Sequence, residues 1–286
     1  MSVELSVTPQ GPYSLSSSAR FASDATRTFR DGLFTQVLEV EGRIEVARAW
    51  QSPQGAVTIA AESAAGIERL RWILALDDDH SEFLRLVRDD PMLGAASRML
   101  RGLRPVRVPT VAQALLRAFC GQLIEAKVAR RLEQTIIRTI CRAGPERLHV
   151  SPSTRELAAL APAQLRALGL HTRRSAALVR LCRSLDLERL HGQPSEAVAR
   201  RLERERGLGP WSVGVVCLQG LGRSDVGLVG DLGLVKLLRA VRGRPVEGWE
   251  TAELLEPYGR WAGLASVYLL TAFGRGLLPV SDARAA

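Results

Sequence analysis

The chain has 286 residues, 46% of them hydrophobic, which is enough for two domains with a sizeable core. No apolar run approaches the roughly 20 residues that a membrane helix needs, and the start, MSVELSVTPQGPY, lacks the basic-then-apolar order of a secretory signal. We therefore expect a soluble intracellular protein with no membrane partner. The four cysteines are scattered along the chain, which disfavours Cys-held zinc and iron–sulfur sites and predicts isolated buried thiols.

The net charge of +9 is unevenly distributed along the chain. Residues 1–105 hold 12 Lys and Arg against 14 Asp and Glu, whereas residues 106–286 hold 27 basic and 16 acidic residues. Arginine supplies 37 of the 39 cations, as GC-rich coding would produce, but such a bias does not explain the imbalance between the two parts. The basic second part indicates a polyanionic partner.

The first part reads as strands and turns followed by helices. Alternating apolar and polar residues predict strands in LFTQVLEV (33–40), GRIEVARAW (42–50) and AVTIAA (56–61), separated by the turn sequences 41–42 and 52–55. Helical spacing begins near Ala64 and returns in SEFLRLVRDD (81–90). The basic stretch RGLRPVRVP (101–109) reads as a connector. We expect a small antiparallel α+β domain over residues 1–105.

Beyond Pro109 the pattern is helical. In the segment 111–142, one apolar stripe contains Val111, Leu115, Phe119 and Leu123. Further helices are predicted at 153–160, 162–167, 173–186, 195–206, 210–220, 231–241 and 251–273, joined by short Gly/Pro loops. The predicted fold class is α+β: a small antiparallel β-sheet N-terminal domain followed by an all-helical domain over residues 106–286.

The helices within 195–220 form a hairpin with a tight turn, Gly207-Leu208-Gly209. Glycine permits positive φ and a close approach of the backbone to another surface, and Pro210 suits a first helical position. The second helix then directs unbonded N–H groups and its positive dipole end outward, which suits a DNA phosphate. The alternative is an ordinary turn between helices, packed against the body of the protein.

The motif LERERGLGPWS (202–212), followed by DV (225–226) and VGD (229–231), resembles the helix–hairpin–helix DNA glycosylase superfamily, and within it the bacterial 3-methyladenine DNA glycosylase II type. Segments 74–94, 118–132 and 165–182 are also similar to that family. The resemblance covers residues from about 70 to 275, and its most specific part is 203–236.

The resemblance implies a monofunctional glycosylase that hydrolyses the N-glycosidic bond of alkylated purines in duplex DNA by base flipping, for base excision repair. Asp231 is then the catalytic carboxylate; it also suits the N-cap of the following helix, and both roles can hold. Backbone N–H groups of Gly207, Gly209 and Ser212 would contact a phosphate. The hairpin carbonyls would hold a structural monovalent cation, and no other cofactor and no side-chain metal ligand is implied.

Further residues of the implied DNA interface lie at the hairpin and beyond it. Leu123, after Gln122, would be the wedge inserted where the damaged nucleotide leaves the stack; alternatively, it belongs to the apolar stripe of its helix. Trp211, Val215 and Leu270 would line the base pocket, with Trp211 stacking on a cationic base or anchoring its helix. Some relatives have aromatic residues where this chain has Val215 and Leu270, which predicts a wider pocket.

Lysine separates the subclasses of this superfamily. Glycosylases that also cut the backbone use a hairpin lysine to form a Schiff base. This chain has only Lys127 and Lys236, and Trp211 occupies the family's lysine position, which implies hydrolysis without lyase activity.

The alternatives to this function are a non-catalytic helix–hairpin–helix DNA-binding protein and a glycosylase for oxidised purines. Asp231 favours an enzyme, because an acid near phosphates weakens simple binding. We expect a monomer acting on damaged double-stranded DNA in the cytoplasm, at the nucleoid.

Overall fold

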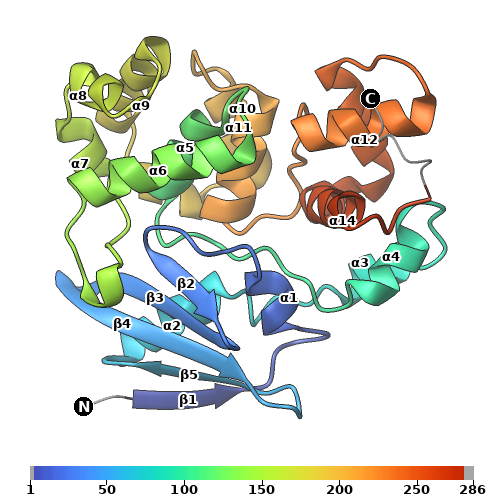
Figure 1. Ribbon diagram of the computed structural model, residues 1–286, viewed down its shortest axis with the longest axis horizontal. Coiled ribbons are helices and arrows are strands. Elements are labelled where there is room, and N and C mark those ends of the chain that lie inside the picture. Colours follow the sequence, from blue (N-terminus) through green and yellow to red (C-terminus); the bar gives the residue numbers. More distant parts are fainter. Residues whose placement is uncertain (1–2, 280–286) are drawn as a thin grey trace.

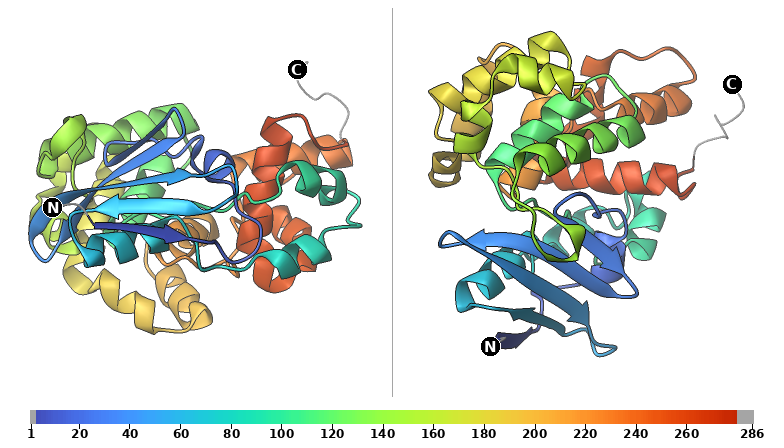
Figure 2. Two further views of the ribbon diagram at one scale, coloured as in Figure 1. Left: turned by 90° about the horizontal axis from the view of Figure 1, so that it is seen from below. Right: turned by 60° about the vertical axis from the view of Figure 1, so that its left-hand side comes forward.

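The computed structural model describes residues 3–279 and places an antiparallel sheet beneath a larger helical body (Figures 1 and 2). The sheet order is β1-β5-β4-β3-β2, and its strands are β1 (Val3–Val7), β2 (Arg27–Arg30), β3 (Leu33–Val40), β4 (Arg43–Gln51) and β5 (Val57–Ala61). The three predicted strands are confirmed. The two edge strands were not predicted: β2 has only four residues, and β1 (VELSV) alternates apolar and polar residues but is only five residues long and exposed almost throughout.

Two tight turns set the register of β2, β3 and β4. Glu41 and Gly42, predicted as a turn, both have positive φ, and so do Asp31 and Gly32 between β2 and β3. Two consecutive residues with positive φ are typical of the two-residue hairpins that match the twist of a sheet. The predicted separation of the strands at residues 41–42 is therefore confirmed.

The two faces of the sheet pack against different partners. Phe34 and Leu38 of β3 belong to a small core with α1 (Leu15–Ala19) and α2 (Ala64–Ile73). Val37, on the opposite face of β3, belongs to the large core of the helical body. One strand thus joins the two cores, because successive side chains of a strand point to opposite faces.

The helical body contains the remaining elements. They are α3 (Ser81–Leu86), α4 (Leu93–Met99), α5 (Val111–Gly121), α6 (Ala126–Ile140), α7 (Thr154–Ala159), α8 (Pro162–Ala167), α9 (Thr172–Ser184), α10 (Ser195–Glu203), α11 (Pro210–Val215), the π-turn η3 (Val216–Gly220), α12 (Leu232–Arg242), α13 (Thr251–Leu255) and α14 (Ala262–Gly274), with short 3₁₀ turns between some of them. Helices α3 and α4 precede residue 106 but pack in the large core beside α14 (Figure 1).

The prediction that Leu123 belongs to the apolar stripe of the segment 111–142 is wrong. Helix α5 ends at Gly121, and α6 begins only at Ala126. Leu123 lies in the loop between them with φ +53° and is 83% exposed. Val111, Leu115 and Phe119 are buried as expected. The helical spacing continues past the point at which the backbone leaves the helix, so periodicity alone could not locate this break.

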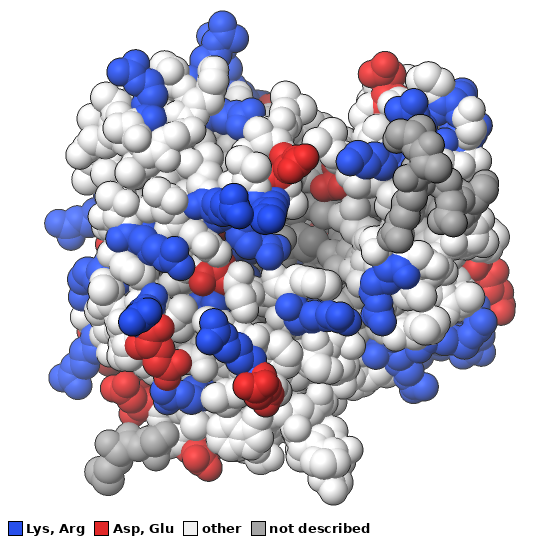
Figure 3. Space-filling view, viewed as in Figure 1, with Lys and Arg blue, Asp and Glu red and all other residues white. Residues whose placement is uncertain are grey.

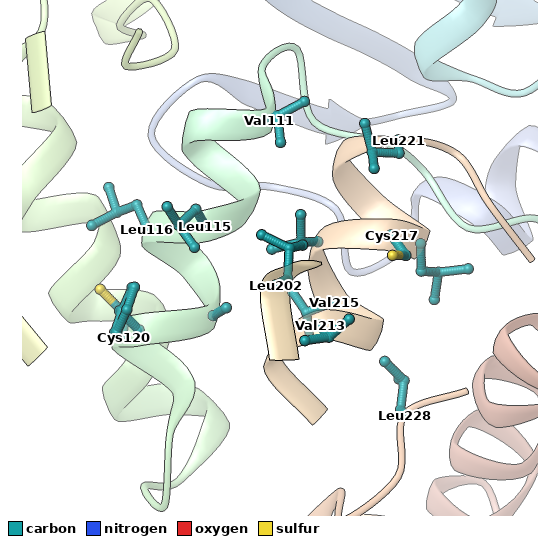
Figure 4. Close-up of a cluster of buried hydrophobic side chains, with 14 of the residues drawn as sticks. Val111, Leu115, Leu116, Cys120, Leu202, Val213, Val215, Cys217, Leu221 and Leu228 are labelled. Carbon is teal, nitrogen blue, oxygen red and sulfur yellow. The ribbon is translucent and has the colours of Figure 1, made fainter. Parts of the chain in front are cut away.

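Helix α5 packs closely against the hairpin through buried side chains from both, including Leu115, Val213 and Cys217 (Figure 4). Gly220 allows this approach, because a Cβ there would lie 2.7 Å from the Cβ of Ala114. All four cysteines are buried and free, as the sequence predicted, and burial raises the pKa of the Cys217 thiol to about 12. None of the described helices combines the length and apolar character that crossing a membrane requires.

Candidate active site

A cleft of about 1580 Å³ lies between the sheet domain, the α5–α6 loop, the hairpin and helices α12 and α14. This volume exceeds the roughly 300–1,000 Å³ of ordinary small-molecule pockets. Figure 3 shows a hollow near the centre of this face, with Lys and Arg side chains on both sides of it. Every site residue predicted from the sequence lines the cleft: Gln122, Leu123, Gly207, Gly209, Trp211, Ser212, Val215, Asp231 and Leu270.

Asp231 is held at the start of α12 by its own carboxylate. One oxygen, Oδ1, accepts hydrogen bonds from the backbone N–H groups of Gly233 at 2.7 Å and Leu234 at 3.3 Å. The residue is therefore the N-cap of α12, the structural role that the sequence suggested for it. The cap fixes the direction of the side chain without using the second oxygen, and the residue remains half-exposed in the cleft.

The second carboxylate oxygen of Asp231 is bound by Trp211. The indole Nε1–H donates to Oδ2 at 2.8 Å. The ring also lies against the end of α5, where a Cβ on Gly121 would come within 2.6 Å of the Trp211 Cη2 atom. Trp211 is thus clamped between α5 and Asp231 with part of its surface open to the cleft.

The loop after α5 is tied to the hairpin by the side chain of Gln122. Its Nε2 donates to the Gly207 carbonyl at 2.8 Å and to the Ser212 hydroxyl at 3.1 Å. These bonds hold the loop at the hairpin turn, so that the exposed side chain of Leu123 projects at the rim of the cleft. The alternative that Leu123 packs in a helical stripe is contradicted by its exposure.

The hairpin turn has the close approach that glycine permits. Gly207 has φ +104°, and a Cβ there would lie 3.2 Å from the Cβ of Ala177 in α9. Gly209 is extended, so it does not require positive φ. Because α11 begins at Pro210, Trp211 and Ser212 lie in its first turn. No preceding carbonyl of the helix can accept a hydrogen bond from their backbone N–H groups. The predicted contact of the Gly207, Gly209 and Ser212 amides with a phosphate stays a prediction.

Three carbonyls at the start of the hairpin turn already accept hydrogen bonds. Those of Glu205, Arg206 and Gly207 accept hydrogen bonds from Leu208 N–H, Arg180 Nη2 and Gln122 Nε2 respectively. A monovalent ion would have to share these oxygens with positively polarised hydrogens. The predicted cation site stays a prediction, and none of the chemistry proposed for the cleft passes through an ion.

The predicted pocket walls differ in their exposure. Val215 is 4% exposed and belongs mainly to the core between α5 and the hairpin (Figure 4). Leu270 is half-buried and lies against α12, since a Cβ on Gly233 would come within 2.5 Å of its Cδ2 atom. Both side chains line the cleft with apolar surface. Trp211 is the aromatic member of the predicted pocket.

Other polar and charged residues, which the sequence did not predict for the site, also line the cleft. Asp24 and Arg27 reach it from the sheet domain, and Arg117 and Gln219 reach it from the packed interface of α5 and the hairpin. Lys236, on α12, also lines it. No local motif marks these residues, since each is placed by tertiary packing.

Four exposed cations line the cleft without an ion-pair partner among residues 3–279. They are Arg20, Arg130, Lys236 and Arg275. Arg20 comes from the sheet domain and the other three from the helical body. The positive charge beside the cleft is therefore not confined to the basic second part of the chain. This distribution suits a phosphate backbone that crosses the opening.

The chain is similar in sequence and in fold to known DNA glycosylases. No family model matches the chain. It is 25% identical over 205 residues to a Bacillus subtilis protein named DNA-3-methyladenine glycosylase, a match that spans 68% of this chain and 67% of that protein. It is 27% identical over 207 residues to a Mycobacterium tuberculosis protein named probable bifunctional transcriptional activator/DNA repair enzyme AlkA; this match spans 71% of the chain but only 42% of that protein.

Solved structures share the fold over almost the whole chain. A 3-methyladenine DNA-glycosylase from Archaeoglobus fulgidus aligns with a TM-score of 0.82 and 19% identity, covering 94% of this chain and 97% of that one. A Clostridium acetobutylicum 8-oxoguanine glycosylase/lyase in complex with DNA aligns with a TM-score of 0.77 and 15% identity, covering 96% and 98%. The fold is that of the helix–hairpin–helix DNA glycosylases. Within that class, the sequence is similar to proteins named 3-methyladenine DNA glycosylase, so the resemblance seen in the sequence is confirmed.

Proposed function

We propose that this protein is a monofunctional DNA glycosylase that hydrolyses the N-glycosidic bond of alkylated purines, of the 3-methyladenine type, in double-stranded DNA for base excision repair. One observation carries the proposal: the Asp231 carboxylate, fixed by Trp211 and by the amides of α12, lines a large cleft with exposed cations around it. The names of the similar proteins support the substrate class.

The chemistry requires a fixed negative charge. Cleavage of an N-glycosidic bond leaves positive charge on the sugar, as in glycoside hydrolysis. A carboxylate near C1′ stabilises that charge, by about 4 kcal/mol for charges 4 Å apart at an effective dielectric of 20. Asp231 meets the requirement of preorganisation, because both its oxygens have fixed donors. It also orients the attacking water. An alkylated base is cationic and leaves readily, so little acid catalysis is needed.

The base must leave the duplex before Asp231 can reach its sugar, which costs a few kcal/mol. Leu123 is the wedge in this proposal, because it is a large apolar side chain held in the open by the Gln122 contacts. The amides of the hairpin turn and the exposed cations of the cleft bind phosphates on either side. We propose that the protein acts as a monomer, in the cytoplasm at the nucleoid.

Two alternatives are less consistent with these contacts. A non-catalytic DNA-binding protein gains nothing from a carboxylate that faces a phosphate-binding cleft and repels its ligand. A glycosylase for oxidised purines with lyase activity needs an amine at the reacting sugar. Trp211 stands at the family's lysine position and donates to Asp231 instead. Lys236 is the amine that lines the cleft, so any lyase activity is expected to depend on it.

The proposal is tested with duplexes that each carry one modified base: 3-methyladenine, 7-methylguanine, hypoxanthine or 8-oxoguanine. Free base is quantified by chromatography, and strand cutting is assayed with and without alkali. We expect release of alkylated bases, intact strands without alkali, and no protein–DNA adduct after borohydride treatment. Failure to release any base would favour the binding-protein alternative. Strand cutting without alkali would contradict monofunctional hydrolysis.

A further inference from the structure

Gln219 is one of only two residues of the segment 211–220 that are not buried; the other is Trp211, and both line the cleft. The two residues lie eight positions apart, near the two ends of this segment. The π-turn η3 covers residues 216–220, so Gln219 lies in π geometry whereas Trp211 lies in the α-helical part. Turns of this kind occur frequently at functional sites.

The position of Gln219 is fixed at two points. Its backbone carbonyl accepts from Val108 N–H at 2.9 Å, and its side-chain Oε1 accepts from Arg117 Nη1 at 2.8 Å. Because a guanidinium only donates, the amide oxygen must face Arg117. The Nε2 amide is then directed away from Arg117, so Gln219 presents hydrogen-bond donors toward the cleft.

Arg117 is itself held rigidly. Its Nε donates to Glu133 at 3.0 Å and its Nη2 donates to Asp24 at 2.8 Å, and both carboxylates are almost fully buried. Burial alone would lower the pKa of Arg117, but the two carboxylates outweigh that effect and raise it, so the guanidinium stays charged. Asp24 comes from the sheet domain, so that domain helps to fix the position of Arg117.

We propose that Gln219, oriented by Arg117, reads position 6 of the extruded purine and selects bases with a carbonyl there, such as 7-methylguanine and hypoxanthine. This inference rests on the proposed glycosylase function. A carbonyl at C6 accepts from Nε2, whereas the amino group of an adenine derivative places a donor against a donor. Val215 and Leu270 provide only apolar contact, so Gln219 supplies the polar discrimination between bases.

The test uses methylated duplex DNA, which carries 7-methylguanine and 3-methyladenine in the same sample. Each release rate is divided by the spontaneous loss of that base. Gln219→Leu removes the donors, and we expect an approximately ten-fold loss, about 1.4 kcal/mol, in release of 7-methylguanine. Release of 3-methyladenine should not fall and should rise modestly, because the variant removes the donor that faces its amino group. Gln219→Glu keeps an acceptor for Arg117 and presents a second acceptor to the cleft, so the ratio should shift further toward 3-methyladenine.

Gln193→Leu, at an exposed position outside the cleft, is the matched control and should leave the ratio unchanged. Thermal melting and DNA binding confirm that each variant is folded. An equal fall for both bases in Gln219→Leu, or an unchanged ratio in Gln219→Glu, would overturn the inference while leaving the glycosylase function intact. Release of neither base by the unaltered protein would refute the proposed function, and the inference with it.

Discussion

Trp211→Phe removes the indole N–H that donates to the Asp231 carboxylate at 2.8 Å and keeps an aromatic wall in the cleft. A hydrogen bond to a charged group contributes about 1.5–3 kcal/mol. Because Trp211 is half-exposed, water replaces part of the lost bond, and the lower end of that range applies. We expect the rate of base release to fall about ten-fold, since each 1.36 kcal/mol corresponds to a factor of ten.

The assay is single-turnover release of 7-methylguanine with enzyme in excess, so that product release does not limit the rate. Trp249→Phe, at an indole that is 66% exposed outside the cleft, is the control and should retain the full rate. The Gly233 and Leu234 amides still cap α12 through Asp231 in the Phe variant, so its melting temperature should change by no more than a few degrees. A rate within two-fold of the unaltered protein would refute the argument that Trp211 positions the carboxylate.

Substitutions at three other residues that line the cleft test their roles. Gly121→Ala should displace the Trp211 ring and slow base release, whereas Gly192→Ala, where a Cβ meets no atom within 4 Å, should not; both are measured in the same single-turnover assay. Leu123→Ala should leave the melting temperature unchanged, because the side chain is 83% exposed, but should reduce base flipping, measured by the fluorescence of 2-aminopurine beside the lesion. Lys236→Ala should remove any borohydride-trapped adduct that forms with DNA, and an adduct that persists would exclude Lys236 as its amine.

The sequence predicted the parts of this protein that depend on local patterns. Strands β3 to β5 show the alternation expected of half-buried strands, and the glycine turn of the hairpin is visible as a motif. Asp231 could be predicted both as a helix cap and as the candidate catalytic acid, because each role has its own sequence context. The capping role is confirmed, and the catalytic role remains a proposal.

The sequence could not predict what tertiary packing decides. Leu123 continues the apolar spacing of α5, but the chain leaves the helix at Gln122, whose side chain bonds to the hairpin more than eighty residues away. Gln219 and Arg117 belong to no motif, and they meet because α5 packs on the hairpin. Asp24, in the sheet domain, accepts a hydrogen bond from Arg117, and the hydrophobic periodicity of residues 1–105 does not indicate this contact.

The central claim is that the negative charge of Asp231 drives hydrolysis. Asp231→Asn retains an oxygen that can cap α12, since Asn and Asp are similarly good N-caps, so the fold and DNA binding should persist. The lost charge corresponds to about 4 kcal/mol, or a rate lower by about a thousand-fold. Asp225→Asn, at an exposed acid of the preceding loop, is the matched control.

Single-turnover release of 7-methylguanine by Asp231→Asn, measured beside its affinity for the same duplex, is the most direct test. We expect a rate at least a hundred-fold below that of both the unaltered protein and Asp225→Asn, with DNA affinity within a few-fold. A folded Asp231→Asn variant that releases base at the unaltered rate would contradict it.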